Sequence, residues 1–327
     1  QVSGTWGSSS SAATNTNDTF FAPTTGVLSV STLVFYSRSN GDWNNVNTWS
    51  TVGHGGPSGS SFPTVADVAI IGGNFAVTVT ADAFCSTLTF DQITGATNAV
   101  NINSGTTLTI SGLVTIPRNN VSGSNTLAVG PGSLSAGSLS FTNGGGLGSQ
   151  QLTVSTGTAT ISGNVAGVGA SSAITISGAG LLRLGGALFS AANGSLTAAV
   201  GSTVEYNGSS AQTVEAHVYQ NLTLSGSNTK TMGNSFTMTG NLLVNNNATF
   251  AIGGFQLVVT GTTNVASGGT ITITNTANTK TFIGLVAIAS GGTWNETVNE
   301  AITFQGGITN NGTFTAGTGV HTFNTSS

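Results

Sequence analysis

The chain has very little charge. Of its 327 residues, Lys and Arg number 5 and Asp and Glu number 9, so that 4% are charged, against about a quarter in an ordinary globular domain. Most enzymes take their acids, bases and ion-binding groups from this set. The formal net charge is −4 and the few basic residues are scattered. There is therefore no basic stripe, and nucleic acid and anionic membranes are poor expected partners.

Cysteine and histidine are scarce as well. Cys85 is the single cysteine, which excludes an intramolecular disulfide and a cysteine-based zinc site, and we expect it to pack as a small apolar residue. His54, His217 and His321 stand in unrelated contexts, without an HExxH or HxH pattern. We therefore expect histidines at the surface or at coil edges and no metal site.

Several other signatures are missing. No glycine-rich turn carries the Asp residues of a calcium-binding repeat, and no glycine-rich loop has the form that binds phosphate. We therefore predict no cofactor. No segment has the composition of a membrane span or of a secretory leader. A chain that begins with Gln1 fits a mature secreted product or a boundary set within a longer sequence.

What the chain does have is a recurring phrase of five residues: apolar, Thr or Ser, apolar, Ser or Thr, Gly. Close variants of it occupy residues 108–112, 159–163, 174–178, 222–226, 236–240 and 257–261. Alternation with a period of two places the apolar side chains on one face of a strand and the hydroxyls on the other. The closing glycine suits a corner with positive φ. The phrase predicts short strands of about four to six residues, separated by Gly, Asn or Ser corners.

Three all-β architectures accommodate many short strands: a sandwich, a barrel or propeller, and a solenoid. Equivalent glycines recur about every 15 to 25 residues, which suits one coil of a solenoid better than a propeller blade. Coils that stack about 4.8 Å apart place like residues over like residues, and stacked charges would repel. We predict a parallel β-solenoid, right-handed by the usual chirality of such connections. At this repeat length along the chain, residues 98–327 provide roughly ten coils.

The composition divides the chain into three parts. Residues 1–33 are polar and of low complexity, and we expect a flexible or assembly arm. Residues 34–97 hold Trp43, Trp49 and turns that contain proline, and we expect a β-rich cap over the first coil, because a solenoid end exposes core and unpaired edges. Residues 98–327 hold the solenoid repeats. Disorder, the other interpretation of a Gly- and Ser-rich chain, does not explain their regular alternation.

Two segments resemble parts of known surface proteins. The first is similar to the start of large secreted surface proteins of Bacteroidetes-type bacteria and to the opening of the G8 domain; it contains Trp43, Trp49, Pro63, Asp67, Val68, Ile70, Gly73 and Val79. The second, residues 203–226, resembles a repeat that is common in those adhesin-like proteins. The resemblance implies a secreted or cell-surface β-solenoid, often within a very long polypeptide, and it defines no catalytic residues.

These observations favour a non-enzymatic structural or adhesive protein, a rod or fibre-forming module of a bacterial cell surface, located outside the cell. Expected partners are other copies of the chain, stacked head to tail, or surface glycans. The composition near residue 327 has no capping character. The polypeptide therefore either continues or stacks its end on another copy.

Two other functions stay open. A carbohydrate-binding adhesin would use exposed aromatic rings as stacking platforms, and the candidates are Trp43, Trp49, Tyr206, Tyr219 and Trp294.

A polysaccharide-degrading β-helix enzyme would need two carboxyl groups several ångströms apart. Glu205 and Glu215 could meet across neighbouring strands, and Glu296 and Glu300 lie beside Trp294. Because lyase chemistry also needs clustered basic residues and those of this chain are dispersed, we expect no catalytic residues.

Overall fold

The computed structural model describes residues 31–92, 95–143, 146–245 and 247–324. Residues 32–327 belong to one unit of the chain. The predicted polar arm at 1–33 lies outside the described residues except for its last three positions. Within the described residues the structure contains 34 strands and one short 3-10 helix, η1 (Val46–Thr48). No helix among them is long and apolar enough to cross a membrane.

The strands form four sheets, which we call A to D. Sheet A runs along the whole described unit and consists, in spatial order, of β3 (Trp49–Ser50), β1 (Val34–Ser37), β4 (Val68–Ile71), β7 (Thr87–Phe90), β9 (Thr107–Pro117), β11 (Ser133–Thr142), β13 (Thr158–Ile161), β16 (Leu181–Leu184), β18 (Thr203–Tyr206), β20 (Asn221–Leu224), β23 (Leu242–Val244), β26 (Thr263–Val265), β29 (Val286–Ile288) and β32 (Ile308–Asn310), with β6 (Ala83–Cys85) and β14 (Val165–Ala166) at its side.

The other three sheets each cover one part of the chain. Sheet B contains β2 (Gly41–Asp42), β5 (Ala76–Val79), β8 (Thr97–Ile102), β10 (Ser124–Val129), β12 (Ser149–Val154), β15 (Ser172–Ile176) and β17 (Ser195–Ala198). Sheet C contains β19 (Gln212–Val214), β21 (Asn228–Met232), β24 (Ala248–Ala251), β27 (Thr270–Ile273), β30 (Thr293–Glu296) and β33 (Thr313–Thr315). Sheet D contains β22 (Phe236–Met238), β25 (Leu257–Val259), β28 (Lys280–Phe282), β31 (Ile302–Phe304) and β34 (His321–Phe323).

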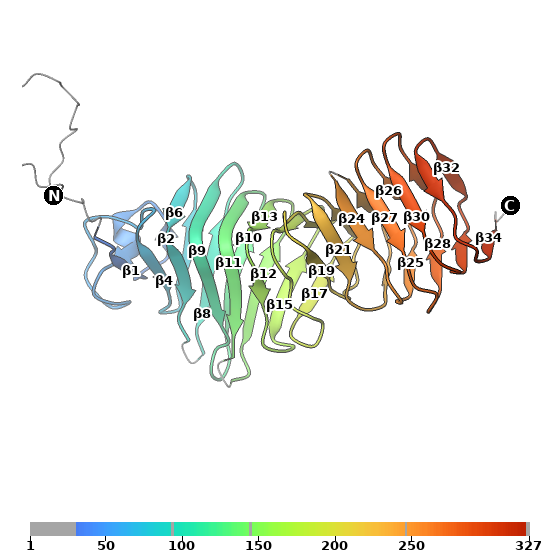
Figure 1. The fold of residues 1–327 in the computed structure, drawn as a ribbon. Coiled ribbons are helices and arrows are strands. Elements are labelled where there is room, and N and C mark those ends of the chain that lie inside the picture. The colour runs from blue at the N-terminus through green and yellow to red at the C-terminus, as the bar shows by residue number, and fades with distance from the viewer. Residues whose placement is uncertain (1–30, 93–94, 144–145, 246, 325–327) are drawn as a thin grey trace, which may run out of the picture. The chain divides into compact units, whose positions relative to one another are not determined.

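The pairing confirms the predicted parallel β-solenoid (Figure 1). Among the described residues, every strand pair except β1–β3 is parallel, and each strand pairs with its counterparts on the preceding and following coils. From β9 onward, partners in sheet A are 18 to 26 residues apart, as in Thr203↔Asn221 and Thr107↔Ser133. Ten strands of sheet A, from β9 to β32, follow one another along the stack, which agrees with the predicted number of coils.

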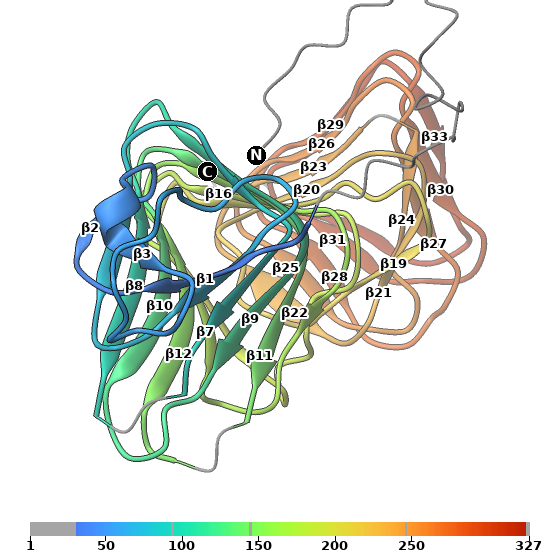
Figure 2. The ribbon, with the colours of Figure 1, turned by 90° about the vertical axis from the view of Figure 1, so that its left-hand side faces the viewer.

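The cross-section of the coil changes partway along the stack. Up to β18 a coil consists mainly of one strand of sheet B and one of sheet A, and sheet B ends at β17. From β20 onward each coil has three short strands, one each in sheets A, C and D. Figure 2 views the unit along the stack, with the first coils in front and the later coils, which contain sheets C and D, behind. The sequence phrase alone did not predict this change, because both kinds of coil use the same alternation.

Alternation places the core as predicted. In β20 the side chains of Leu222 and Leu224 are buried, while Asn221 and Thr223 face outward and are half-buried. Like residues stack on like residues from coil to coil. The rings of Phe282, Phe304 and Phe323 lie in register in sheet D and are stacked, with centroids 5.8 and 5.5 Å apart.

The block at 34–97 shares its sheets with the rest of the solenoid. Its strands β4 and β7 belong to sheet A and β5 belongs to sheet B, all in parallel pairing with later strands. The first part of the block differs, because β3 runs antiparallel to β1 and forms the edge of sheet A. Trp49, the first residue of β3, and Trp43 are both buried.

Two strands are longer than predicted. β9 and β11 span eleven and ten residues, and their pairing shifts register between Ala136 and Ser138. This irregularity is a bulge, which bends a strand without ending it, so two predicted short strands are continuous here.

The glycines that close the phrase have two different roles. Positive φ occurs at Gly178 (83°) and Gly226 (75°), as predicted. The other four have ordinary backbone angles and are Gly112, Gly163, Gly240 and Gly261. Here the neighbouring coil comes too close for a side chain: a Cβ at Gly163 would lie 2.6 Å from the carbonyl oxygen of Gly137. At these positions the prediction of a positive-φ corner is wrong, and close stacking of the backbone explains the glycine.

This difference leads to a stability test. We expect Gly163→Ala to lower the free energy of unfolding by about 1–3 kcal/mol, since an added methyl group in a packed site forces the backbone to shift. The control is Gly55→Ala, where nothing lies within 4 Å of the added Cβ. Urea denaturation followed by circular dichroism would measure both variants. Equal stability of the two would contradict the close-stacking explanation.

Candidate functional site

The five aromatic residues predicted as glycan platforms lie in the core. Trp43, Trp49, Tyr206, Tyr219 and Trp294 are all 0% exposed. A buried ring presents no face to a sugar, so the prediction is wrong for these residues. Alternation turns Tyr206 and Trp294 toward the interior of their coils, whereas Trp43 and Tyr219 lie outside the strands and are buried by the packing around them.

Most of their polar atoms form hydrogen bonds inside the protein, whereas the buried indole nitrogen of Trp43 has no partner among the described residues. The indole nitrogen of Trp49 donates to the carbonyl oxygen of Trp43 at 2.7 Å, and the two rings pack edge to face with centroids 5.0 Å apart. The hydroxyls of Tyr206 and Tyr219 lie 3.0 Å apart, and that of Tyr219 donates to the carbonyl oxygen of Glu215 at 2.6 Å. Burial raises the pKa of both tyrosines. These residues stabilise coils.

The carboxyl groups of Glu205 and Glu215 have different surroundings. Glu205 accepts a hydrogen bond from Arg183 at 2.8 Å and another from the hydroxyl of Ser225 at 2.6 Å. Burial raises the pKa of the Glu215 carboxyl. Arg183 already neutralises Glu205, so the arrangement does not present two free carboxyl groups to a substrate.

Glu296 anchors the last described coils. Its carboxyl group accepts from the indole nitrogen of Trp294 at 2.5 Å and from the backbone of Gly317 at 3.1 Å, and it lies 2.6 Å from His321 Nε2. Glu300 is fully buried, and its carboxyl oxygens have no hydrogen-bond partner among the described residues. The two acids therefore lie in the interior.

Ser37, His54 and Asp91 combine the residue types of a hydrolytic triad. His54 Nε2 lies 2.8 Å from Asp91, and its Nδ1 lies 2.6 Å from the carbonyl oxygen and 3.4 Å from the hydroxyl of Ser37. The hydroxyl of Ser37, however, is fully buried, donates to the carbonyl oxygen of Gly72 and accepts from its backbone N–H. A nucleophile must reach a substrate, and the Ser37 hydroxyl is enclosed, so the contacts of this cluster tie early coils together.

The sequence did not reveal this cluster, because its members are far apart in the chain and follow no motif. The remaining histidines stand in separate settings. His217 is buried beside Phe189, and burial lowers its pKa. Among the described residues there is no group of three acidic, histidine or cysteine side chains that could hold a metal ion.

Cys85 is buried, and burial raises the pKa of its thiol. This agrees with the expected apolar packing. Its side chain is inert by the usual criterion that reactive thiols are exposed and have a low pKa.

Two lysines are buried in corners of the coils. The ammonium group of Lys230 donates to the carbonyl oxygen of Gly208 at 2.6 Å and to the side chain of Gln212 at 2.7 Å. That of Lys280 donates to the carbonyl oxygen of Ala277 at 2.7 Å. Burial lowers the pKa of both lysines. Each lysine thus closes a turn.

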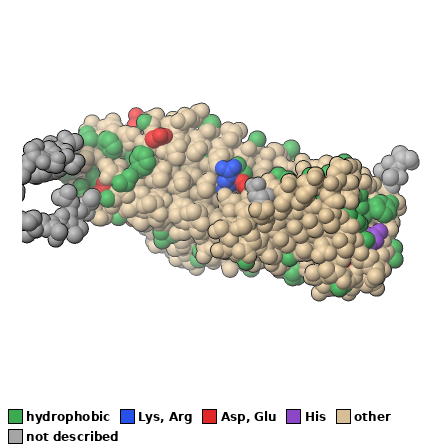
Figure 3. All heavy atoms as spheres, turned by 45° about the horizontal axis from the view of Figure 1, so that its top comes forward, with side chains coloured by type: hydrophobic (Ala, Val, Ile, Leu, Met, Phe, Trp, Pro, Cys, Tyr) green, Lys and Arg blue, Asp and Glu red, His purple; other side chains and the backbone are tan. Residues whose placement is uncertain are grey.

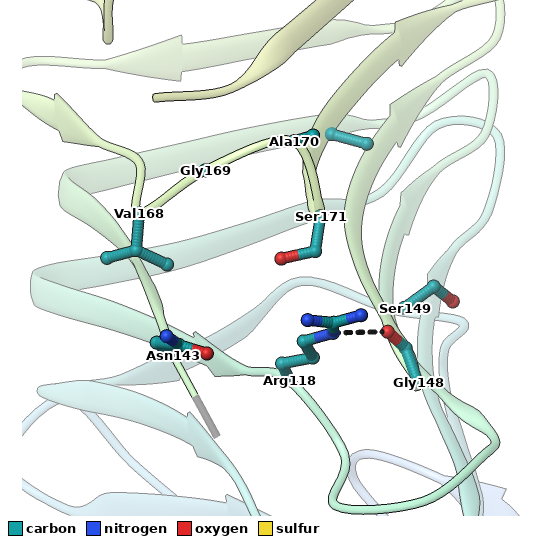
Figure 4. Close-up of a pocket in the computed structure, with 9 residues that line it drawn as sticks. Arg118, Asn143, Gly148, Ser149, Val168, Gly169, Ala170 and Ser171 are labelled. Carbon is teal, nitrogen blue, oxygen red and sulfur yellow. Dashed lines mark hydrogen bonds between the residues drawn. The ribbon is translucent and has the colours of Figure 1, made fainter. Parts of the chain in front are cut away.

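The surface shown in Figure 3 is almost free of charged side chains, apart from small groups of blue and red atoms. A hollow of about 500 Å³ lies among the loops of the coils that have strands in sheets A and B. It is lined by segments from three successive coils: Arg118, Asn143, Gly148, Ser149, Val168, Gly169, Ala170, Ser171 and Ala173. Figure 4 shows the Arg118 guanidinium reaching across this hollow, with Val168 and Ser171 opposite it. The sequence analysis did not identify this hollow, because its residues come from unrelated loops.

Comparisons of the chain with protein-family models, with curated proteins and with solved structures find no match.

The cluster around His54 leads to a test by pH. Burial alone lowers the pKa of His54, but hydrogen bonds to Asp91 and to the Ser37 carbonyl, together with the Asp91 charge, raise it above its ordinary value of 6.5. A raised pKa in the folded state means that this stabilisation is complete below pH 6.5 and is lost as the pH rises through the folded-state pKa.

We therefore expect the stability difference between the wild type and His54→Gln to be larger at about pH 6 than at about pH 8.5. Urea denaturation of both proteins at the two pH values measures this difference. Because both proteins contain His217, its contribution cancels when one free energy of unfolding is subtracted from the other. A difference that is constant or grows with pH would contradict the assigned interaction.

Proposed function

We propose that this chain is a non-enzymatic structural module of an extracellular surface, a solenoid segment that serves as a spacer and presents its faces to partners. The observation that carries the proposal is the uninterrupted parallel ladder of sheet A, from β1 to β32. Each coil covers the apolar interior of the next, so that coils can be added without changing the design. A protein that must span distance can be built in this way.

The outward faces support the same role. In sheet C, five threonines lie in register on successive coils: Thr229, Thr249, Thr270, Thr293 and Thr313. Threonine is β-branched and neutral, so such a ladder fits the pleat and adds no repulsion between coils. Neutral faces also make coil stacking insensitive to salt, since exposed ion pairs are screened and these faces have very few. This suits a protein exposed to a variable medium.

The buried acids favour this role over the enzymatic one. Glu205 is paired with Arg183, and Glu296 is hydrogen-bonded within the core. Of the four candidate acids that the sequence offers for glycan cleavage, Glu205 and Glu296 therefore have structural partners, and Glu300 is fully buried.

Immunogold labelling of intact source cells tests the proposed location. We expect antibodies against the solenoid to label the outside of unpermeabilised cells, and we expect external proteinase K treatment to abolish the label. The matched control is an antibody against a cytoplasmic protein, which should label only permeabilised cells. Labelling by the solenoid antibody that requires permeabilisation would contradict the proposal.

A further inference from the structure

The five basic side chains of the chain differ in what surrounds their charge. Lys230 and Lys280 are buried, and their ammonium groups donate to backbone and side-chain oxygens. Arg183 is paired with Glu205 at 2.8 Å. The side chain of Arg38 donates to two backbone carbonyl oxygens, through Nε at 2.9 Å and Nη1 at 3.1 Å. Four of the five cations therefore have partners that occupy their charged groups.

Arg118 is different. Its Nε donates to the carbonyl oxygen of Gly148 at 3.0 Å, which fixes the direction of the guanidinium. Its two Nη groups have no hydrogen-bond acceptor among the described residues, and no carboxylate there forms an ion pair with it. A guanidinium carries five N–H donors, so four of them remain for a ligand. In a chain with so little charge, this is a half-buried cation that faces a hollow and has no counter-ion in the part of the chain that the structure describes.

The neutral groups around Arg118 can also bind a ligand. The hydroxyl of Ser171 accepts a hydrogen bond from Gln150 at 3.2 Å, and its own proton is therefore available to an acceptor in the hollow. Ser149 is exposed at the rim. Val168 and Ala170 add carbon surface to the lining. Hollows of about 300–1,000 Å³ are the size class of small-molecule sites, and this one falls within that class.

The lining selects the kind of anion. Phosphate sites usually offer several free backbone N–H groups. Here several of the lining N–H groups are already used: Gly148 donates to Asn119, Ser149 to Gly123, Gly169 to Asn193 and Val168 to the hydroxyl of Ser172. A single planar guanidinium with a fixed direction matches a carboxylate, which can accept two parallel hydrogen bonds. The hydroxyls and the carbon surface match a ring that carries hydroxyl groups on its edge and C–H groups on its faces.

We infer that the hollow around Arg118 binds a carboxylated sugar, a hexuronate residue of an acidic polysaccharide. The carboxylate is held by the Arg118 Nη groups. Ring hydroxyls bind the Ser149 and Ser171 side chains, and the ring packs against Val168 and Ala170. The site does not depend on the proposed spacer role, because a structural solenoid needs no ligand here. Failure of the binding test would leave that role standing.

Isothermal titration calorimetry with trigalacturonate tests the site. We expect the wild type to bind it and Arg118→Gln to bind about tenfold or more weakly, since a hydrogen-bonded charge is lost. The matched control is Arg183→Gln, which removes a guanidinium already paired with Glu205 and should bind like the wild type. Ser171→Asp keeps Arg118 and places a carboxylate in the hollow. We expect it to lose binding as well, which separates loss of the charge from a disturbed loop.

Four results would overturn the inference. These are no binding by the wild type, unchanged affinity of Arg118→Gln, equal affinity for the neutral trisaccharide in which each carboxyl is reduced to an alcohol, and a similar loss in Arg183→Gln. Inorganic phosphate and hexanoate complete the test as competing probes. If either binds as tightly as trigalacturonate, the sugar assignment is wrong.

Discussion

The structure depends on the parallel backbone ladder between successive coils. Each strand of sheet A hydrogen-bonds to the strand one coil earlier and one coil later, in a register that repeats every 18 to 26 residues from β9 onward. The ladder fixes the distance between coils at about 4.8 Å. At that distance each position is stacked on its own counterpart. The aromatic stack of Phe282, Phe304 and Phe323, the threonine ladder of sheet C and the glycines at close backbone contacts all follow from it.

The same constraint explains the shortage of charge and the place of the charges that remain. A charge on an outward face would lie next to its counterpart on the neighbouring coil, where like charges repel. Many of the described acids and bases occur as cross-coil pairs such as Arg183 and Glu205, in corners where carbonyl groups surround them, or inside the last coils. Arg118 departs from this pattern, since its guanidinium faces an open hollow and four of its N–H donors have no acceptor among the described residues. That departure distinguishes it as a binding group.

The sequence was sufficient to predict the architecture. Alternation in the recurring phrase predicted which residues of β20 face the core, and the spacing of the phrase predicted the coil. Three features were beyond it. For Trp43 and Trp294 structural packing was the favoured interpretation and a glycan platform the alternative, because the sequence does not show what surrounds a side chain. The change from two sheets to three depends on where corners bend. The contacts of Ser37 with His54 bring together segments that are far apart in the chain, and so does the hollow at Arg118. No sequence pattern links those segments.

Engineered disulfides between coils measure the central feature directly. Thr153 and Thr175 are register partners in sheet B, whereas Ala173 lies two residues away from that register on the same face. Facing Cα atoms about 4.8 Å apart can be bridged, while a two-residue offset exceeds the roughly 7 Å limit. We expect oxidation to link Thr153→Cys/Thr175→Cys and to leave Thr153→Cys/Ala173→Cys with free thiols, with the buried Cys85 unchanged. Linkage of the offset pair alone, or of neither pair, would contradict the stacked register on which this account depends.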